Sequence, residues 1–364
     1  MKRWLARLGA VLSFTLGTVA ALEALLALAA PVPLNSPRFR TSERYCTELT
    51  AGSDGVITTA DFRHTFHVDE RGRRTSGSGP RAGARTVAVV GDSMVFGEGV
   101  ADGETFVARL PGALAAAGAG EWDAWNLGIG GHGTGQHLAR LEDLVASGAR
   151  PDVALVTFFA NDPRDDRECR PFRLAADGAA LTRAVPADMA HPPPKRLPWL
   201  VEQPAYRWIT SHSQIVGRLR LRAARSPEKR VSAAGAPGLN ALDEPLSPDA
   251  VRLTNALYRR LAADARSWEL PIGLVLVPHK GCFTGGDAAR ACATKLDTVA
   301  RIAAESGLPL LDLRTVFDPA RLDSDYHAHD LHWTVAGHAR ATAPIAAFIE
   351  QLAASRGGTV RPST

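Results

Sequence analysis

The sequence lacks a short repeat, a long run of basic residues and a Cys-x-x-Cys pair. Because it has no repeat and 45% of its residues are hydrophobic, it is neither collagen-like nor disordered. Because it has no basic run and a formal net charge of only +4, a nucleic-acid partner is not expected. Without a Cys-x-x-Cys pair, zinc binding or redox work by cysteine is not expected. The 364 residues are enough to bury a sizeable core.

Residues 1–34 form a hydrophobic leader that begins with three basic residues in its first seven positions. Positions 8–30 are long enough to span a membrane if Glu23 lies near an interface. Alternatively, Ala27-Leu28-Ala29 offers the small-x-small site of a cleaved signal peptide. Both interpretations carry the rest of the chain across a membrane. The basic N-terminus favours an uncleaved anchor in a bacterial cell membrane, with secretion after cleavage as the alternative.

All four cysteines follow this leader. An even number of cysteines in an oxidising compartment predicts two disulfides. Cys282 and Cys292 bracket a glycine-rich loop and are expected to pair locally, which leaves Cys46 to pair with Cys169.

Short apolar strands alternate with helical stretches along the rest of the chain. This alternation predicts an α/β fold with a parallel sheet that helices cover on both faces. The expected strands are 86–90, 121–125, 153–159, 272–277 and 308–313, and the expected helices are 105–117, 135–146, 287–306 and 335–354.

Two further segments complete the expected organisation. A polar extension and linker covers 35–84, ahead of one catalytic domain over 85–354 and a tail at 355–364. Within the domain, about 163–270 is expected to be an insertion with two helices, near 206–224 and 247–268. Its aromatic residues fit either a lipid or sugar surface or a small core of its own.

Polar side chains follow the first and third strands, where ligands bind in such sheets. Gly91-Asp92-Ser93 follows the first strand, so the Ser93 hydroxyl is expected at the sheet edge beside free backbone N–H groups. The alternative is that Asp92 or Ser93 simply caps a helix. Asn161 follows the third strand, where its amide can donate to an oxyanion or form an ordinary Asn-Asp-Pro turn.

A glycine-rich segment, 126–134, follows the second strand. The spacing of Gly128, Gly130 and Gly133 matches a dinucleotide-binding fingerprint, but an acidic residue is missing from the end of the next strand. We therefore expect these glycines to bring backbone N–H groups close to a reacting oxygen.

Four histidines lie close together after the fifth strand, at 327, 329, 332 and 338. Their spacing differs from the H-x-H-x-D-H pattern of dinuclear zinc hydrolases, and no matching ligand cluster occurs elsewhere. Serine hydrolysis needs only one histidine as base and one acid to orient it, here His332 and Asp330. No metal or cofactor is therefore expected.

Together these motifs resemble the SGNH/GDSL hydrolases over about 85–354, apart from the insertion. Gly91-Asp92-Ser93 is similar to their block I, and 126–131 to their block II. Block III, usually G-x-N-D, has Phe159 in its first position. The resemblance implies a three-layer α/β/α sandwich with a five-stranded, flavodoxin-like parallel sheet. It also implies an oxyanion hole from the Ser93 and Gly131 N–H groups and the Asn161 amide.

Block V departs from the family pattern by one residue. Its usual D-x-x-H is here Asp330-Leu331-His332, because position 329 is histidine. Asp330 is therefore the expected acid and Asp325 the fallback. A D-x-H-W form with a glycine following resembles the cell-envelope branch of the family, which includes relatives of polysaccharide O-acetylation.

We therefore expect an envelope ester hydrolase that acts on an acyl ester, with acetyl as one candidate acyl group, of a glycan, lipid or small molecule. Ser93 is the expected nucleophile, His332 the base and Asp330 its partner. The alternatives are an envelope polysaccharide O-acetyltransferase that uses the same site, and an inactive binding module on the same fold. The expected partners are the ester substrate and the membrane, with no nucleic acid.

Overall fold

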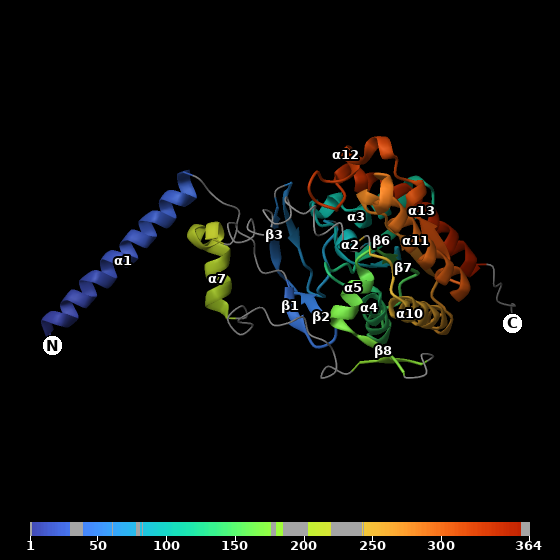
Figure 1. Ribbon diagram of the computed structural model, residues 1–364, viewed down its shortest axis with the longest axis horizontal. Coiled ribbons are helices and arrows are strands. Elements are labelled where there is room, and N and C mark those ends of the chain that lie inside the picture. The colour runs from blue at the N-terminus through green and yellow to red at the C-terminus, as the bar shows by residue number, and fades with distance from the viewer. Residues whose placement is uncertain are drawn as a thin grey trace. The chain divides into compact units, whose positions relative to one another are not determined.

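The computed structural model describes residues 2–29, 39–59, 61–77, 81, 83–175, 180–184, 203–219, 242 and 244–357. The chain divides into two compact units, which are described separately (Figure 1). The smaller unit comprises Met1–Pro37 and Lys195–Gly235, and the larger comprises Arg38–Pro194 and Ala236–Thr364.

The larger unit is built on one five-stranded parallel sheet. The strands lie in the order β11-β10-β7-β5-β6, which is the flavodoxin-like order predicted from the sequence. Strand order reverses at β5, because β6 pairs on one side of it and β7 on the other. The strands are β5 (Arg85–Val90), β6 (Trp122–Asn126), β7 (Val153–Phe158), β10 (Ile272–Leu276) and β11 (Leu310–Asp312).

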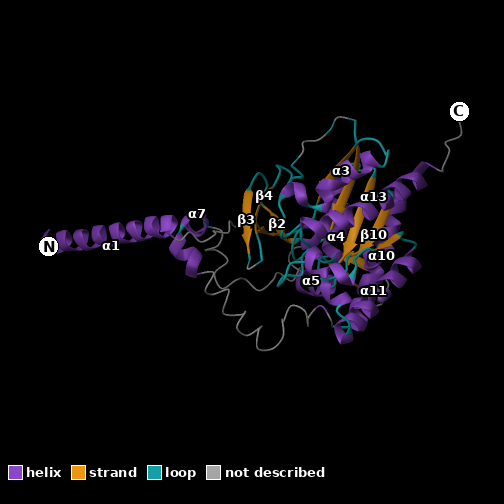
Figure 2. Ribbon diagram, turned by 90° about the horizontal axis from the view of Figure 1, so that it is seen from above, coloured by secondary structure: helices purple, strands orange, loops and turns teal. Residues whose placement is uncertain are grey.

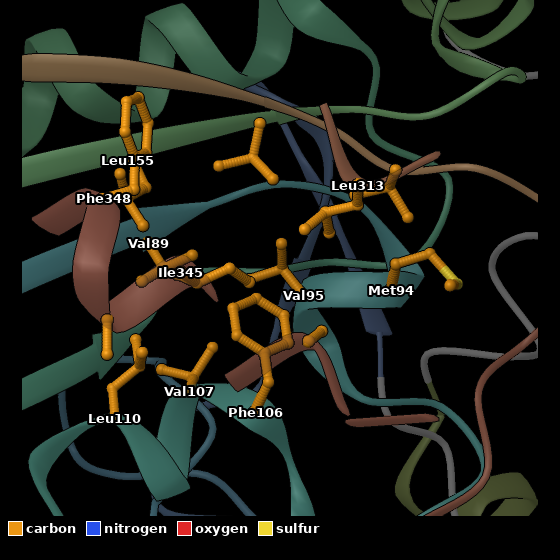
Figure 3. Packing of buried hydrophobic residues seen from close by; sticks show 14 of the residues in the cluster. Val89, Met94, Val95, Phe106, Val107, Leu110, Leu155, Leu313, Ile345 and Phe348 are labelled. Atoms are coloured by element: carbon orange, nitrogen blue, oxygen red, sulfur yellow. The ribbon is translucent and has the colours of Figure 1, made fainter. Parts of the chain in front are cut away.

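Helices cover both faces of this sheet, as Figure 2 shows, which confirms the predicted three-layer α/β/α architecture. Successive side chains of β5 enter two different cores, because side chains alternate along a strand. Val87 and Val89 join the core of α3 (Phe106–Ala116) and α13 (Val335–Gly357), part of which is drawn in Figure 3. Ala88 and Val90 join the core of α4 (Thr134–Ala146), α10 (Pro248–Ser267) and α11 (Gly286–Ser306).

Local sequence signals begin and end these helices. The Thr105 hydroxyl accepts the Ala108 N–H at the start of α3, and the Ser247 hydroxyl accepts the Ala250 N–H at the start of α10. Helix α11 ends at Gly307, whose φ of 74° favours glycine. The helix bounds therefore lie within a few residues of those expected.

The N-terminal extension folds as two hairpins that pack on the larger unit. They are β1 (Phe39–Ser42) with β2 (Cys46–Leu49), and β3 (Asp54–Thr58) with β4 (Arg63–His67). Ile57 and Phe66 of the second hairpin are buried against Phe96 and Ile129. The disulfide Cys46–Cys169 joins the first hairpin to the end of α5 (Asp162–Cys169). The extension is therefore an integral part of this unit.

Short elements complete the larger unit. The second disulfide, Cys282–Cys292, closes a ten-residue separation and gives the pairing expected from the sequence. The remaining short elements are α2 (Ser93–Phe96), α12 (Leu322–Asp325), β8 (Phe172–Leu174), β9 (Leu181–Arg183) and the 3₁₀ turns at Asp102–Glu104, Lys280–Phe283, Leu313–Thr315 and Pro319–Arg321.

The smaller unit contains the apolar helix α1 (Lys2–Ala29) and helix α7 (Pro204–His212). Residues Arg3–Ala29 contain an 18-residue stretch with a mean hydropathy of 2.0 and are long enough to cross a membrane. The single helix predicted for 206–224 is wrong in its continuity, because α7 ends at His212 and Ser213 is extended. A second short helix covers 214–219, and residues 220–224 lie outside the described residues, as does the Pro-rich patch at 192–194.

Candidate active site

Ser93 lies at the tight turn between β5 and α2, where strand order reverses. A Cβ atom at Gly91 would lie 2.1 Å from the Thr157 hydroxyl, so this turn requires glycine. The Asp92 carboxylate accepts the Met94 N–H at 2.9 Å and caps α2. The capping alternative therefore holds for Asp92, while Ser93, the first residue of the helix, is left to present its hydroxyl.

The structure brings Ser93, His332 and Asp330 into one hydrogen-bonded row. His332 Nε2 lies 2.7 Å from Ser93 Oγ. On the opposite side of the ring, His332 Nδ1 hydrogen-bonds Asp330 Oδ1, which also accepts the His332 backbone N–H at 2.9 Å. This second bond shows how Asp330, only two residues before His332, can reach the ring. The same carboxylate oxygen bonds the backbone N–H and the ring nitrogen of His332.

Electrostatics prepare His332 to accept a proton. Burial lowers the pKa of His332, but the hydrogen bond and negative charge of Asp330 outweigh that effect, so the net pKa is raised. Burial raises the pKa of Asp330, but the hydrogen bond and charge of His332 outweigh it and bring that pKa down to about 2. Asp330 is therefore a carboxylate at neutral pH and stabilises an imidazolium.

The fallback acid, Asp325, has a different partner. Its carboxylate forms an ion pair with Arg340 at 2.6 Å and is fully buried there. The structure therefore places Asp325 in a structural pair at the start of α13 and places Asp330 beside the histidine.

The neighbouring histidines are dispersed. The His338 ring is buried, stacks on Phe106 and accepts the Phe106 N–H at 3.2 Å. The His327 ring packs on Phe62 with centroids 4.7 Å apart. The His329 ring is exposed and hydrogen-bonds Asp61. Each ring therefore has a separate environment, and they do not form a shared ligand set.

Among the described residues, the grouping with metal-ligand geometry is His279 with Cys282 and Cys292. The two sulfurs are joined in a disulfide, so they cannot supply thiolates. This grouping does not fit a metal.

Gly131 and Asn161 occupy the turns after β6 and β7. Gly131 has a φ of 78°, a conformation that glycine adopts without strain. The Asn161 amide donates to Asp165 Oδ2 at 2.6 Å. Because an amide group carries two N–H donors, Asp165 occupies one and leaves the other for an oxyanion. Gly128 packs closely against α2, where a Cβ would lie 2.2 Å from the Phe96 backbone nitrogen.

A group of buried carboxyl groups lies behind these turns. Burial raises the pKa of Asp92 to about 7, that of Asp165 to about 6 and that of Asp166 to about 7. Asp162 hydrogen-bonds the Thr134 hydroxyl at 3.0 Å, and burial raises its pKa also. Asp162 and Asp166 fasten the segments after β6 and β7 to one another, because Asp162 accepts from Thr134 and Asp166 accepts the Gly135 N–H at 2.7 Å.

The extension supports the end of α2, which Ser93 begins, through Arg74, a residue that the sequence placed in a linker. The fully buried Arg74 guanidinium donates to the carbonyl oxygens of Phe96, Gly97 and Val100, at 2.7–2.8 Å. Its Nε donates to Asp102 at 2.8 Å. The backbone just after α2 is therefore held by a side chain from outside the α/β fold.

The extension also holds the loop that carries His332 and Asp330. Asp61, between β3 and β4, accepts the His329 backbone N–H at 2.6 Å and its ring Nδ1 at 2.7 Å. The Lys280 ammonium donates to the carbonyls of His327 and Ala328, at 3.2 and 2.8 Å. Neither Asp61 nor Lys280 stands in a motif, and no local signal distinguishes them in the sequence.

Comparison with known proteins gives a family match. The model of the GDSL-like lipase/acylhydrolase family matches residues 89–340, which is more than half of the chain. No curated protein matches the sequence.

Three solved structures are among those to which this chain is similar. A lipase/acylhydrolase from Enterococcus faecalis is 17% identical, with 77% of this chain and 99% of that chain covered and a TM-score of 0.39. A psychrotrophic esterase from Pseudoalteromonas sp. is 13% identical, with 73% and 97% covered and a TM-score of 0.39. An acetyl xylan esterase from Geobacillus stearothermophilus is 16% identical, with 74% and 94% covered and a TM-score of 0.42.

Proposed function

Because the chain belongs to the GDSL-like lipase/acylhydrolase family and is a carboxylic ester hydrolase, we propose that Ser93, His332 and Asp330 are its catalytic triad. The observation that carries the proposal is the 2.7 Å contact between His332 Nε2 and Ser93 Oγ, with Asp330 on the other ring nitrogen. A nucleophile, a base and an orienting acid in this row are what acyl transfer requires.

The reaction proceeds in two halves. Ser93 Oγ attacks the ester carbonyl carbon, and its proton passes to His332 Nε2. The tetrahedral intermediate collapses, the bond to the leaving alcohol breaks, and His332 returns the proton to that alcohol. Water then attacks the acyl-serine by the same route, which releases the acid and restores the serine.

The Ser93 and Gly131 N–H groups and the free Asn161 N–H form the proposed oxyanion hole. Asp165 fixes the Asn161 amide, so the donor is oriented before charge develops on the substrate oxygen. Preorganised donors of this kind avoid a reorganisation cost in the transition state, and one is worth about 3 kcal/mol.

The proposed setting is the outside of a cell membrane. The apolar helix α1 begins with basic residues, and two disulfides occur in the larger unit. Disulfides persist in oxidising compartments, and basic residues tend to stay on the cytoplasmic side of a membrane. We therefore place α1 in the membrane as an anchor and the hydrolase domain, 85–354, outside the cytoplasm.

The test is covalent labelling of the full-length protein with a fluorophosphonate probe, with hydrolysis of p-nitrophenyl acetate in parallel. Wild type is expected to be labelled on Ser93 and to turn over. Ser93→Ala is expected to lose both properties, and Ser324→Ala, a serine on α12, is the matched control that keeps both. Equal hydrolysis by wild type and Ser93→Ala would overturn the proposal.

A further inference from the structure

The apolar part of helix α1 contains one charged residue, Glu23, and other residues of the smaller unit donate hydrogen bonds to its carboxylate. Glu23 Oε1 accepts the Ser213 hydroxyl at 2.5 Å and the Ile215 N–H at 3.3 Å, while Oε2 accepts the Gln214 N–H at 2.7 Å. An ionisable group within a membrane helix is costly unless it is paired, so this carboxylate marks a place where a partner segment meets the helix. The partner is the junction between α7 and the helix at 214–219.

The position of Glu23 sets the depth of that junction. Glu23 precedes Ala29, the last residue of α1, by six positions. At a rise of about 1.5 Å per residue, the carboxylate lies about 9 Å along the helix from its end. Amphipathic helices that lie on membranes bury their apolar face about 5–10 Å into the boundary between headgroups and acyl chains. With the end of α1 at the membrane surface, a junction at this position lies at the depth of that boundary.

The side chains of 203–219 have the character of an interfacial segment. Trp208, Ile209 and Leu219 are exposed to 64%, 42% and 59%. The Trp208 ring stacks on His212 with centroids 4.9 Å apart, which combines an apolar body with a polar edge. Tryptophan is enriched at the membrane–water boundary for the same reason.

Charge favours lipid as the occupant of this surface. Arg218 lies next to the exposed Leu219. The sequence at 220–230 continues with the basic residues Arg220, Arg222, Arg225, Lys229 and Arg230, against one acidic residue, Glu228. Basic residues that adjoin an apolar segment in the sequence attract anionic lipid headgroups.

We propose that residues 203–219, here named the interfacial segment, lie in the boundary layer of the bilayer that holds α1. Trp208, Ile209 and Leu219 enter the acyl region, and Glu23 fixes the segment to α1. This inference rests on the proposal that α1 stays in the membrane, and it is independent of the chemistry at Ser93.

The test measures lipid contact directly in the full-length protein. Ile209→Cys is labelled with an environment-sensitive fluorophore in vesicles of phosphatidylethanolamine and phosphatidylglycerol that contain doxyl-labelled phosphatidylcholine. The matched control is Asp249→Cys, at an exposed position of α10. The label at 209 is expected to be blue-shifted and quenched about threefold more strongly than the label at 249, as for a side chain in the boundary layer.

Substitutions of Glu23 test the link to α1. Glu23→Leu keeps the helix apolar but removes the acceptor, so quenching at 209 is expected to fall toward the control value while the protein still sediments with vesicles. Glu23→Gln keeps one acceptor oxygen and is expected to retain most of the quenching. Ser93→Ala is expected to leave quenching unchanged, which separates this test from that of the catalytic proposal.

Three outcomes would overturn the inference. The first is equal quenching at 209 and 249 in vesicle-bound protein. The second is a label at 209 that is shielded from iodide in water but not quenched by lipid, which indicates a protein occupant. The third is a full-length chain that does not sediment with vesicles.

Discussion

Asp61 binds His329 through both of its carboxylate oxygens, and so fastens a hairpin near the N-terminus to the loop that ends in His332. The side chain of Asp61 is only 8% exposed, whereas that of His329 is 81% exposed. The carboxylate is therefore fixed by its own surroundings, and the loop is held against it. Asp61 is a positioning residue, since it touches neither Ser93 nor His332.

Asp61→Ala is expected to lower kcat for p-nitrophenyl acetate about 10-fold or more and to change KM little, because small displacements of a catalytic group are costly. Asp54→Ala, on an exposed position of the same hairpin, is the control. A larger change in KM than in kcat, or an equal loss in both variants, would contradict the positioning role.

The pH profile should follow His332, which must be neutral to accept the serine proton. Its pKa is raised above the ordinary 6.5, with Asp330, Glu98 and Asp92 as the negative groups that face it. The ring therefore stays protonated to a higher pH than usual, and kcat/KM should fall as the pH drops through a midpoint above 6.5. Removing a negative group should move the midpoint of this acidic fall in kcat/KM to lower pH.

Asp330→Asn supplies the comparison. It should shift the acidic limb of kcat/KM downward and lower the plateau rate about 10⁴-fold, as loss of an orienting acid does. Burial raises the pKa of Asp92 to about 7, so an acidic limb that stays in place in Asp330→Asn would assign the transition to Asp92 instead.

Asn161→Ala is expected to lower kcat about 10²- to 10³-fold with little change in KM, because the amide acts on charge that develops in the transition state. Asp165→Asn, which keeps an oxygen for the amide, is expected to lose less. Steady-state kinetics on both variants provide the measurement, and an unchanged kcat in Asn161→Ala would remove this residue from the oxyanion hole.

The two disulfides should contribute unequally to stability. Cys46–Cys169 links residues 123 apart and Cys282–Cys292 links residues 10 apart. Loop-closure entropy gives about 5 kcal/mol for the first and about 3 kcal/mol for the second. Urea unfolding of the two double Cys→Ser variants should show the larger loss for Cys46 and Cys169; the reverse order would contradict the entropic account.

Arg74→Met is expected to lower the free energy of unfolding by about 3–5 kcal/mol, because it removes the guanidinium from the buried Asp102 carboxylate, which keeps only His67 and Thr75, and leaves three carbonyls without their donor. Arg71→Met, at an exposed position three residues earlier, is the control and should change little. Denaturant midpoints measure both, and equal values would show that the three carbonyls after α2 find other donors.

The sheet could be predicted from the sequence because each strand is a short apolar run between turn residues. The 86–90 run became β5 with one added residue, and the motifs after β5, β6 and β7 came to one sheet edge because parallel strands end together. Ser93 and His332 were recognisable because a G-D-S turn and an Asp-His pair each have a chemical purpose. The strand runs and these two motifs are all contained in short stretches of the sequence.

The support of the site could not be predicted, because it depends on long-range contacts. Arg74 stands in an Arg-Gly-Arg-Arg run that is typical of a linker, and its burial depends on carbonyls more than twenty residues away in the chain. The break at Ser213 was missed for a related reason. The extended residue is favoured by Glu23, which lies 190 positions earlier.

The contact between Ser93 and His332 joins residues 239 positions apart. During synthesis the serine therefore leaves the ribosome long before its base exists. Until the last part of the chain has folded against β5, Ser93 is an ordinary alcohol with an ordinary, unreactive hydroxyl. In the proposed triad, the order of the residues therefore delays esterase activity until the segment that carries His332 has been made and has folded beside Ser93.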